Sequence, residues 1–224
     1  MSHICQYCKK SFVKESSLAV HSCEPRRRRQ EKDDAGVRVG FHAYIKFYEL
    51  TQGSAKLKTY DDFCESPYYK AFVKFGRYCV NTRVINPSRF TEWVLKQNKK
   101  LDYWCSDKLY EEYLLFYLKV ETMEDALARA IEHTLTWSEE KGSPSYDYLR
   151  YGNHNTITQS IVSGRISPWV LYNSESGQKF LSEMNTEHQA MVWAYIDPDA
   201  WTKKLKDDPA NRIEAQELLK KAGW

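Results

Sequence analysis

The chain opens with one dense pattern, Cys5-x2-Cys8-x12-His21-x-Cys23. Cysteine sulfur and histidine nitrogen are the ligands that Zn²⁺ takes in tetrahedral protein sites. Cys5 and Cys8 are spaced to converge from a tight turn, and His21 follows at the end of a helix expected over residues 14–20. We therefore expect Cys5, Cys8 and His21 to bind Zn²⁺ as the cofactor of this segment.

The fourth ligand is the unusual member of the set. Cys23 is the preferred residue, although it follows His21 by one residue only. Residues two apart do not share a helix face, so the helix must unwind by about His21 and Cys23 must come from the exit turn. Pro25 agrees with a helix that ends there. His3 or a water molecule is the alternative fourth ligand.

Two apolar residues, Phe12 and Leu18, lie between the ligand pairs and suit a miniature core. The pattern Cys5-x2-Cys8-x3-Phe12-x5-Leu18-x2-His21 resembles zinc fingers of the ββα type and covers a small part of the chain. That family places its fourth ligand three to five residues after the histidine, and Cys23 departs from this spacing. The resemblance implies a fold that the metal stabilises by about 10 kcal/mol, because so short a segment buries little surface.

Fingers of this type read DNA from the start and the outward face of their helix. The equivalent positions here are Lys14, Ser16, Ser17 and Val20. Lys14 suits a phosphate or guanine contact, whereas the serines discriminate poorly and valine cannot form a hydrogen bond. One finger also reads only about 3 base pairs. We expect low sequence specificity, with phosphate, RNA or protein contact as the open alternatives.

Four consecutive arginines follow the finger, namely Arg26, Arg27, Arg28 and Arg29. Such a cluster suits contact with a phosphate backbone, which is independent of sequence and sensitive to salt. Acidic residues at 31, 33 and 34 partly offset the charge, so a solvated linker over residues 26–36 is the alternative interpretation. We expect Lys14 and the four arginines to bind DNA or RNA.

The composition limits the class of protein. Hydrophobic residues make up 42% of the 224 residues and the net charge is only +3, so any nucleic-acid affinity must come from a local patch. No apolar run approaches the roughly 20 residues that cross a bilayer, and the first residues lack a signal-peptide core. The pattern of cysteines indicates an intracellular, reducing compartment in which they bind metal rather than form disulfides.

Residues 37–224 read as one helical domain, which makes the chain mostly α with a small ββα finger at residues 1–25. Helix-start signals of the form Ser, Asn or Asp followed by Pro recur along this domain. Together with capping and periodicity they predict helices near 41–48, 67–80, 87–97, 109–118, 126–140, 168–173, 198–206 and 209–222. The helix at 109–118 is apolar on nearly every side and is expected to be central and buried.

Two further segments carry possible binding features. The helix at 67–80 is expected to bury Tyr69, Phe72 and Val73 while Lys70, Lys74 and Arg77 lie along one edge, a pattern that suits nucleic acid or an ordinary solvated face. Residues 156–173 are interpreted as two short helices joined by a turn at Gly164, with a DNA-binding helix-turn-helix as the weaker alternative.

No catalytic motif stands out, and we assign no catalytic residue. The finger, arginines and aromatic helical body together faintly resemble uncharacterised zinc-finger proteins of large tailed bacteriophages, which implies the host cytoplasm. We predict a zinc-binding, non-enzymatic, nucleic-acid-associated protein. The alternatives are a phage assembly or scaffold protein that docks a protein partner through its finger, and an enzyme that processes nucleic acid, in which a loop at His154 is a candidate site.

Overall fold

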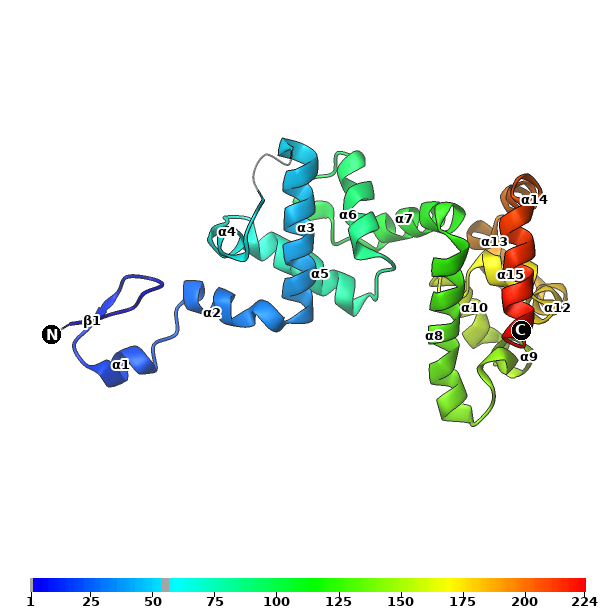
Figure 1. The fold of residues 1–224 in the computed structure, drawn as a ribbon, viewed down its shortest axis with the longest axis horizontal. Helices are drawn as coiled ribbons and strands as arrows, with labels where there is room; N and C mark the ends of the chain where they lie inside the picture. The colour runs from blue at the N-terminus through cyan, green and yellow to red at the C-terminus, as the bar shows by residue number, and fades with distance from the viewer. Residues whose placement is uncertain (1, 54–56) are drawn as a thin grey trace. The chain divides into compact units, whose positions relative to one another are not determined.

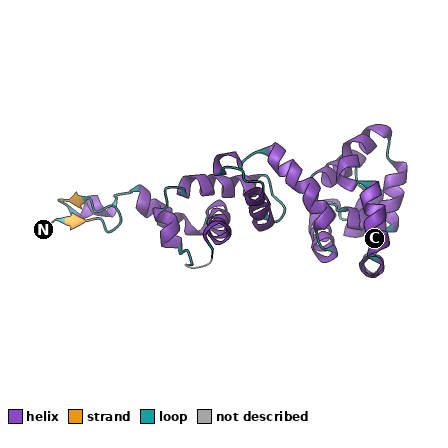
Figure 2. Cartoon of the chain, turned by 90° about the horizontal axis from the view of Figure 1, so that it is seen from above, coloured by secondary structure: helices purple, strands orange, loops and turns teal. Residues whose placement is uncertain are grey.

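The computed structural model describes residues 2–53 and 57–224, and helices dominate them (Figures 1 and 2). Contacts within the chain form two compact units, Met1–Tyr110 and Glu111–Trp224, called unit 1 and unit 2 below. The mostly α fold with a small N-terminal sheet is confirmed. Among the described helices, none joins the length and the apolarity that a membrane crossing requires.

Unit 1 begins with the expected finger. Strands β1 (His3–Ile4) and β2 (Ser11–Phe12) pair antiparallel, with His3 opposite Phe12 and Ile4 opposite Ser11, and Figure 2 shows them at the N-terminal end of the chain. Helix α1 (Glu15–Ala19) follows and is shorter than the expected 14–20. The ββα order of the finger is therefore present.

The segment interpreted as a linker is helical. Helix α2 (Glu24–Gln30) is followed by the 3₁₀ helix η1 (Glu31–Asp33). Pro25 lies in the first turn of α2, where its missing N–H costs no hydrogen bond, so this proline starts a helix rather than marking the end of one. Glu24 at the first turn and three arginines in the last complement the helix dipole. The division of the chain into a finger at 1–25, a linker at 26–36 and a helical domain at 37–224 stays a prediction.

The rest of unit 1 is built around a close helix crossing. Its helices are α3 (Ala35–Gln52), α4 (Tyr60–Glu65), α5 (Tyr69–Asn81), α6 (Pro87–Lys96), η2 (Leu101–Tyr103) and the start of α7 (Asp107–Val120). Helices α3 and α5 cross where glycines face each other, as their overlap in Figure 1 illustrates. A Cβ on Gly76 would lie 1.9 Å from the carbonyl oxygen of Gly36, so only glycine permits this approach.

Aromatic rings fill the space around this crossing. The ring of Trp104 lies 5.2 Å from that of Phe75 and 6.0 Å from that of Phe72, both near perpendicular. Edge-to-face packing at such distances adds stability beyond the burial of area. All three side chains are fully buried. As expected, α5 also buries Tyr69, Phe72 and Val73 and exposes Lys70, Lys74 and Arg77.

Unit 2 contains the remaining helices. They are α8 (Met123–Lys141), η3 (Ser145–Asp147), α9 (Tyr148–Tyr151), α10 (His154–Val162), α11 (Pro168–Asn173), α12 (Glu175–Glu183), α13 (Thr186–Ile196), α14 (Pro198–Asp207) and α15 (Pro209–Lys221). Helices α11, α14 and α15 start at the predicted prolines, and the side chain of the residue before each proline accepts a backbone N–H.

Two expectations about helix environment meet different outcomes. Helices α10 and α11 flank a turn in which Gly164 has a φ of 71°, as the preferred interpretation of 156–173 predicts.

Helix α7, in contrast, is not buried on nearly every side. It buries one face that includes Tyr113 and Tyr117, whereas Phe116 is 45% exposed. The aromatic run hid this pattern because an exposed and a buried ring look alike in a sequence.

Candidate metal centre

The four predicted ligands meet in space. The ligand atoms of Cys5, Cys8, His21 and Cys23 all lie within 4.8 Å of one another. No other group of three or more histidine, cysteine or acidic side chains in the described part of the chain is arranged in this way. All six cysteines are free thiols, so the first 23 residues hold no disulfide that would compete with a metal. The sequence pattern therefore corresponds to a cluster that could bind a metal ion.

The distances within the cluster are close to those around a tetrahedral ion. Cys5 Sγ lies 3.9 Å from Cys23 Sγ, and Cys8 Sγ lies 3.2 Å from His21 Nε2. Zn–S bonds of about 2.3 Å and Zn–N bonds of about 2.0 Å place the ligand atoms of a tetrahedron about 3.5 to 3.8 Å apart. Because four protein ligands fill such a shell, the geometry suits a structural metal and leaves no position for substrate.

Backbone geometry brings the first two ligands together. Residues 6–8 form a turn, Cys5 donates its N–H to the carbonyl of Lys10, and Lys9 donates back to Cys5. Lys9 itself has a φ of 60°, which tightens the turn. Cys5 is the buried member of the cluster and the other three ligands are half-buried. The hairpin thus holds the Cys5–Cys8 pair as a preformed half of the site.

The other two ligands lie beyond the end of α1. His21 follows the helix, and its ring packs 4.6 Å from that of Phe12. Cys23 is the residue that precedes α2 and has an extended backbone, with φ −126° and ψ 158°. The expectation that the helix unwinds before Cys23 is therefore met. His3 lies in β1 and is not a member of the cluster.

Two of the thiols have shifted acidities. Hydrogen bonding from the backbone N–H of Cys8 lowers the pKa of the Cys5 thiol to about 7, whereas burial raises the pKa of the Cys23 thiol. Metal binding requires thiolates, so a bound cation would stabilise the deprotonated form of both residues. Soft sulfur ligands together with an imidazole favour zinc among the abundant metals.

The structure gives the four arginines different surroundings. Arg26 donates to the carbonyl of His21 at 2.7 Å. Arg28 donates to the carbonyl of Cys64 at 2.7 Å and pairs with Glu24 at 2.6 Å. Its side chain is only 18% exposed. These two arginines therefore bind the chain itself, one holding the exit of the finger and the other holding α2 against α4.

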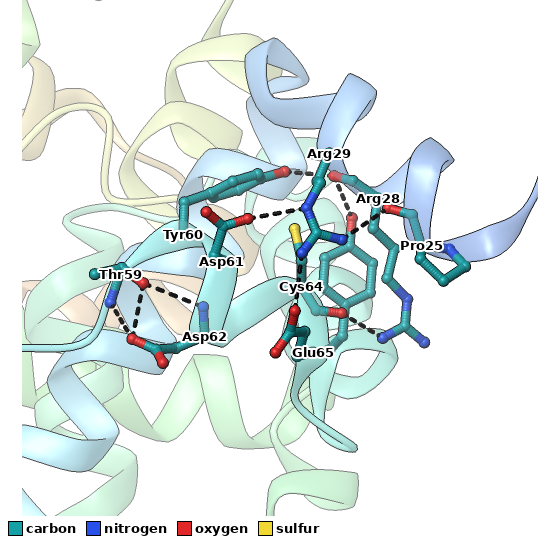
Figure 3. Close-up of polar contacts among 10 residues, drawn as sticks. Pro25, Arg28, Arg29, Thr59, Tyr60, Asp61, Asp62, Cys64 and Glu65 are labelled. Atoms are coloured by element: carbon teal, nitrogen blue, oxygen red, sulfur yellow. Dashed lines mark hydrogen bonds and ion pairs between the residues drawn. The ribbon is translucent and has the colours of Figure 1, made fainter. Parts of the chain in front are cut away.

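Arg29 completes the attachment of α2 to α4. Figure 3 shows its guanidinium between two carboxylates of α4, Asp61 and Glu65, each at 2.9 Å. The same guanidinium lies 5.5 Å from the ring centre of Tyr7 in the finger. Tyr60 donates its hydroxyl to the backbone carbonyl of Arg28 at 2.6 Å, which satisfies an open carbonyl of α2 (Figure 3). Arg29 thus contacts both the finger and α4.

Arg27 and Lys14 are the predicted binding residues that face solvent. The side chain of Arg27 is 61% exposed, and its ion pair with Glu31 is long at 3.7 Å. Lys14 is exposed and precedes α1. The acidic partners on α4 escaped the sequence interpretation because they lie more than thirty residues beyond the arginines, and no local pattern marks such a pair.

No family model, curated protein or solved structure matches this chain. The metal cluster is therefore supported by its residues and their geometry. The resemblance to bacteriophage proteins stays a prediction.

Proposed function

We propose that this protein binds Zn²⁺ as a structural ion and associates with nucleic acid with low sequence specificity. The observation that carries the proposal is the closed Cys₃His cluster, whose last ligand directly precedes the arginine-rich helix α2. A metal at Cys23 would fix the first turn of α2 and hence the position of its cations. Closed sites of this kind stabilise a fold rather than activate a water molecule.

The sequence predicted that Lys14 and all four arginines contact phosphate, whereas the proposal assigns this contact to Lys14 and Arg27. Arg28 and Arg29 hold helix α2 in place, so their charge adds to the local field while their terminal guanidinium nitrogens are engaged within the chain. Lys14 and Arg27 keep exposed donors. Phosphate contact through such exposed cations carries no information about base sequence. A variant that replaces all four arginines would disturb the fold as well as binding.

The test is a salt titration of binding. The zinc-loaded full chain is mixed with fluorescently labelled oligonucleotides of two unrelated sequences, each single-stranded and duplex, and fluorescence anisotropy is measured from about 50 to 200 mM salt. We expect the logarithm of the affinity to fall linearly with the logarithm of salt concentration, with little difference between the two sequences. Lack of binding at the lowest salt would end the nucleic-acid part of the proposal.

A second candidate function rests on exposed apolar residues of the finger. Ile4 is 57% exposed, Val13 is 89% exposed and Val20 is 84% exposed. Exposed apolar side chains mark protein contacts where they form a contiguous patch. A scaffold or assembly protein would use them to dock a protein partner. Copurification of one stoichiometric protein partner without nucleic acid would favour this function.

The alternative of a nucleic-acid enzyme stays a prediction. The ring of His154 packs 5.1 Å from Phe180, and His188 forms a 2.7 Å hydrogen bond with Asn155. His133 forms a 2.8 Å hydrogen bond with Ser160, which is buried. A catalytic nucleophile must be able to reach its substrate. Because Ser160 is buried, its hydrogen bond with His133 is better explained as a link between helices α10 and α8.

A further inference from the structure

Helices α2 and α5 border a cleft of about 800 Å³ in unit 1. Its lining includes five cations and two carboxylates. The cations are Arg27, Arg28, Lys70, Lys74 and Arg77, and the carboxylates are Glu24 and Glu31. The excess of positive charge in a concave surface focuses the electrostatic field, which raises the local concentration of anions.

The cations of α5 form a row because of helical spacing. Lys70, Lys74 and Arg77 are separated by four and then three residues, which places them on one face of the helix. Their neighbours Tyr69 and Val73 turn inward and are buried. The inward face fixes the rotation of α5, so the three cations are held along the cleft rather than scattered around the helix.

The carboxylates around the cleft neutralise this row only in part. Glu24 is shared, since it pairs with Arg28 at 2.6 Å and with Lys70 at 3.3 Å. Arg77 lies 4.0 Å from Glu31 and 3.9 Å from Asp34, beyond hydrogen-bonding distance. Lys74 forms no ion pair with any residue that the structure describes. The donors of Lys74 and Arg77 are therefore free to bind an external anion.

The floor of the cleft adds polar and aromatic groups. The guanidinium of Arg28 lies 4.6 Å from the ring centre of Tyr69, and its Nε is buried and has no acceptor among the described residues. Tyr78, Asn81 and Cys105 also line the cleft. Grooves that follow a single strand combine cations with aromatic side chains, and Tyr78 is the half-buried ring in this lining.

We propose that this cleft binds the sugar–phosphate backbone of a single-stranded nucleic acid, with Lys70, Lys74 and Arg77 contacting successive phosphates. The proposal rests on the nucleic-acid association proposed above and moves the main contact from the arginine run to the α2–α5 cleft. A single strand is flexible enough to enter a concave site of this volume. A duplex presents a stiff, convex surface, which would reach only the rim.

The test compares two triple variants with the same change of charge. The cleft variant carries Lys70→Gln, Lys74→Gln and Arg77→Gln. Glutamine at 77 retains the Cγ that packs against Gly36 in the wild type. The control variant carries Lys96→Gln, Lys99→Gln and Lys100→Gln, which are exposed residues of unit 1 outside the cleft lining. Circular dichroism and thermal melting establish that both variants fold before binding is measured.

We expect the cleft variant to bind single strands at least about tenfold more weakly than the wild type at about 50 mM salt. The slope of log affinity against log salt should fall by about 2, because each single-strand phosphate contact contributes about 0.7. The control variant should stay within about threefold of the wild type, since it removes the same charge without removing contacts.

The outcomes separate this inference from the proposed function. Equal weakening in the two variants would overturn the cleft and leave the proposed function standing. Lack of binding by the wild type would end both. Tighter binding of duplex than of single strand, lost in the cleft variant, would overturn the choice of single-stranded ligand.

Cys105 provides a second readout that does not depend on substitution. It lines the cleft and is half-buried, while Cys64 and Cys79 are buried in the core. Burial raises the pKa of the Cys105 thiol, so alkylation by N-ethylmaleimide is best followed at mildly alkaline pH. We expect saturating single strand to slow alkylation of Cys105, measured by peptide mass spectrometry. An unchanged rate at saturation would place the ligand elsewhere.

Discussion

Within the run Arg26–Arg29, each side chain meets a different environment. Arg28 is held by backbone carbonyls and Glu24, Arg29 by two carboxylates of α4, and Arg27 faces solvent. Ion pairs between exposed groups contribute about 0 to 1 kcal/mol each. Arg29 gains from geometry, because its planar guanidinium binds two acceptors at once. Identical residues at neighbouring positions therefore divide into stabilising residues and one residue that remains available to a partner.

The fourth ligand is tested by substitution at two positions. We expect Cys23→Ala to lower zinc affinity by about 100-fold or more, since one of four ligands in a site worth roughly 10 kcal/mol or more is lost. His3→Ala, the matched control, should keep one zinc per chain because His3 lies outside the cluster.

The measurement is a competition with a chromophoric chelator, supported by Co²⁺ substitution, in which the sulfur-to-metal absorption reports the number of thiolate ligands. A larger loss of zinc with His3→Ala than with Cys23→Ala would show that His3 is the fourth ligand.

At the scale of elements, the crossing of α3 and α5 positions much of unit 1. Gly36 and Gly40 on α3 face Gly76 on α5, and the backbones approach so closely that a methyl group has no space. The close approach brings the rings of Phe72 and Phe75 against Trp104. It also fixes the rotation of α5, and with it the row of cations in the cleft. Gly76 thus links the packing of α3 and α5 to the proposed binding surface.

We expect Gly76→Ala to destabilise unit 1 by about 3 kcal/mol, because the new methyl group would overlap the backbone of α3 and force the helices apart. The loss should exceed the slight gain in helix propensity that alanine brings. Urea unfolding followed by tryptophan fluorescence measures the change. A stability equal to or above that of the wild type would show that α3 and α5 do not cross at these glycines.

At the scale of the whole molecule, the metal cluster and the basic cleft both belong to unit 1. Unit 2 has its own core, in which Trp169 and Trp201 pack at 5.2 Å and near right angles. It also holds a buried ion pair between Glu121 and Arg129, and burial raises the pKa of Glu121. Separate cores predict that a change confined to unit 1 leaves the stability of unit 2 largely unaffected.

Metal removal tests this separation. We expect a chelator to lower the temperature of one unfolding transition in calorimetry while a second transition stays within about 2 °C of its value with zinc. The transition that moves belongs to unit 1, because zinc binds to the folded finger and thereby stabilises the unit that contains it. Addition of zinc should restore it, whereas magnesium, the control cation, should not. A single transition that moves as a whole would show that the two units unfold together.

The sequence by itself determined the features that depend on near neighbours. The spacing of Cys5, Cys8, His21 and Cys23 predicted the cluster, and polar residues before prolines predicted where α6, α11, α14 and α15 begin. Capping and ligand spacing act within a few residues, so these rules can be applied without knowledge of the fold. The exposed edge of α5 followed from helical period in the same way.

Only the tertiary structure decided what the arginines of α2 contact and which face of α7 is exposed. Asp61 and Glu65 lie 32 and 36 residues from Arg29 along the chain. The cations of α5 are farther still from Arg29. Charges so distant along the chain meet only after helices have packed, and packing depends on the glycine crossing rather than on the charges. The chain alone therefore specified a finger with metal-ligand spacing and a set of helices, while their packing formed the cleft in which we place the ligand.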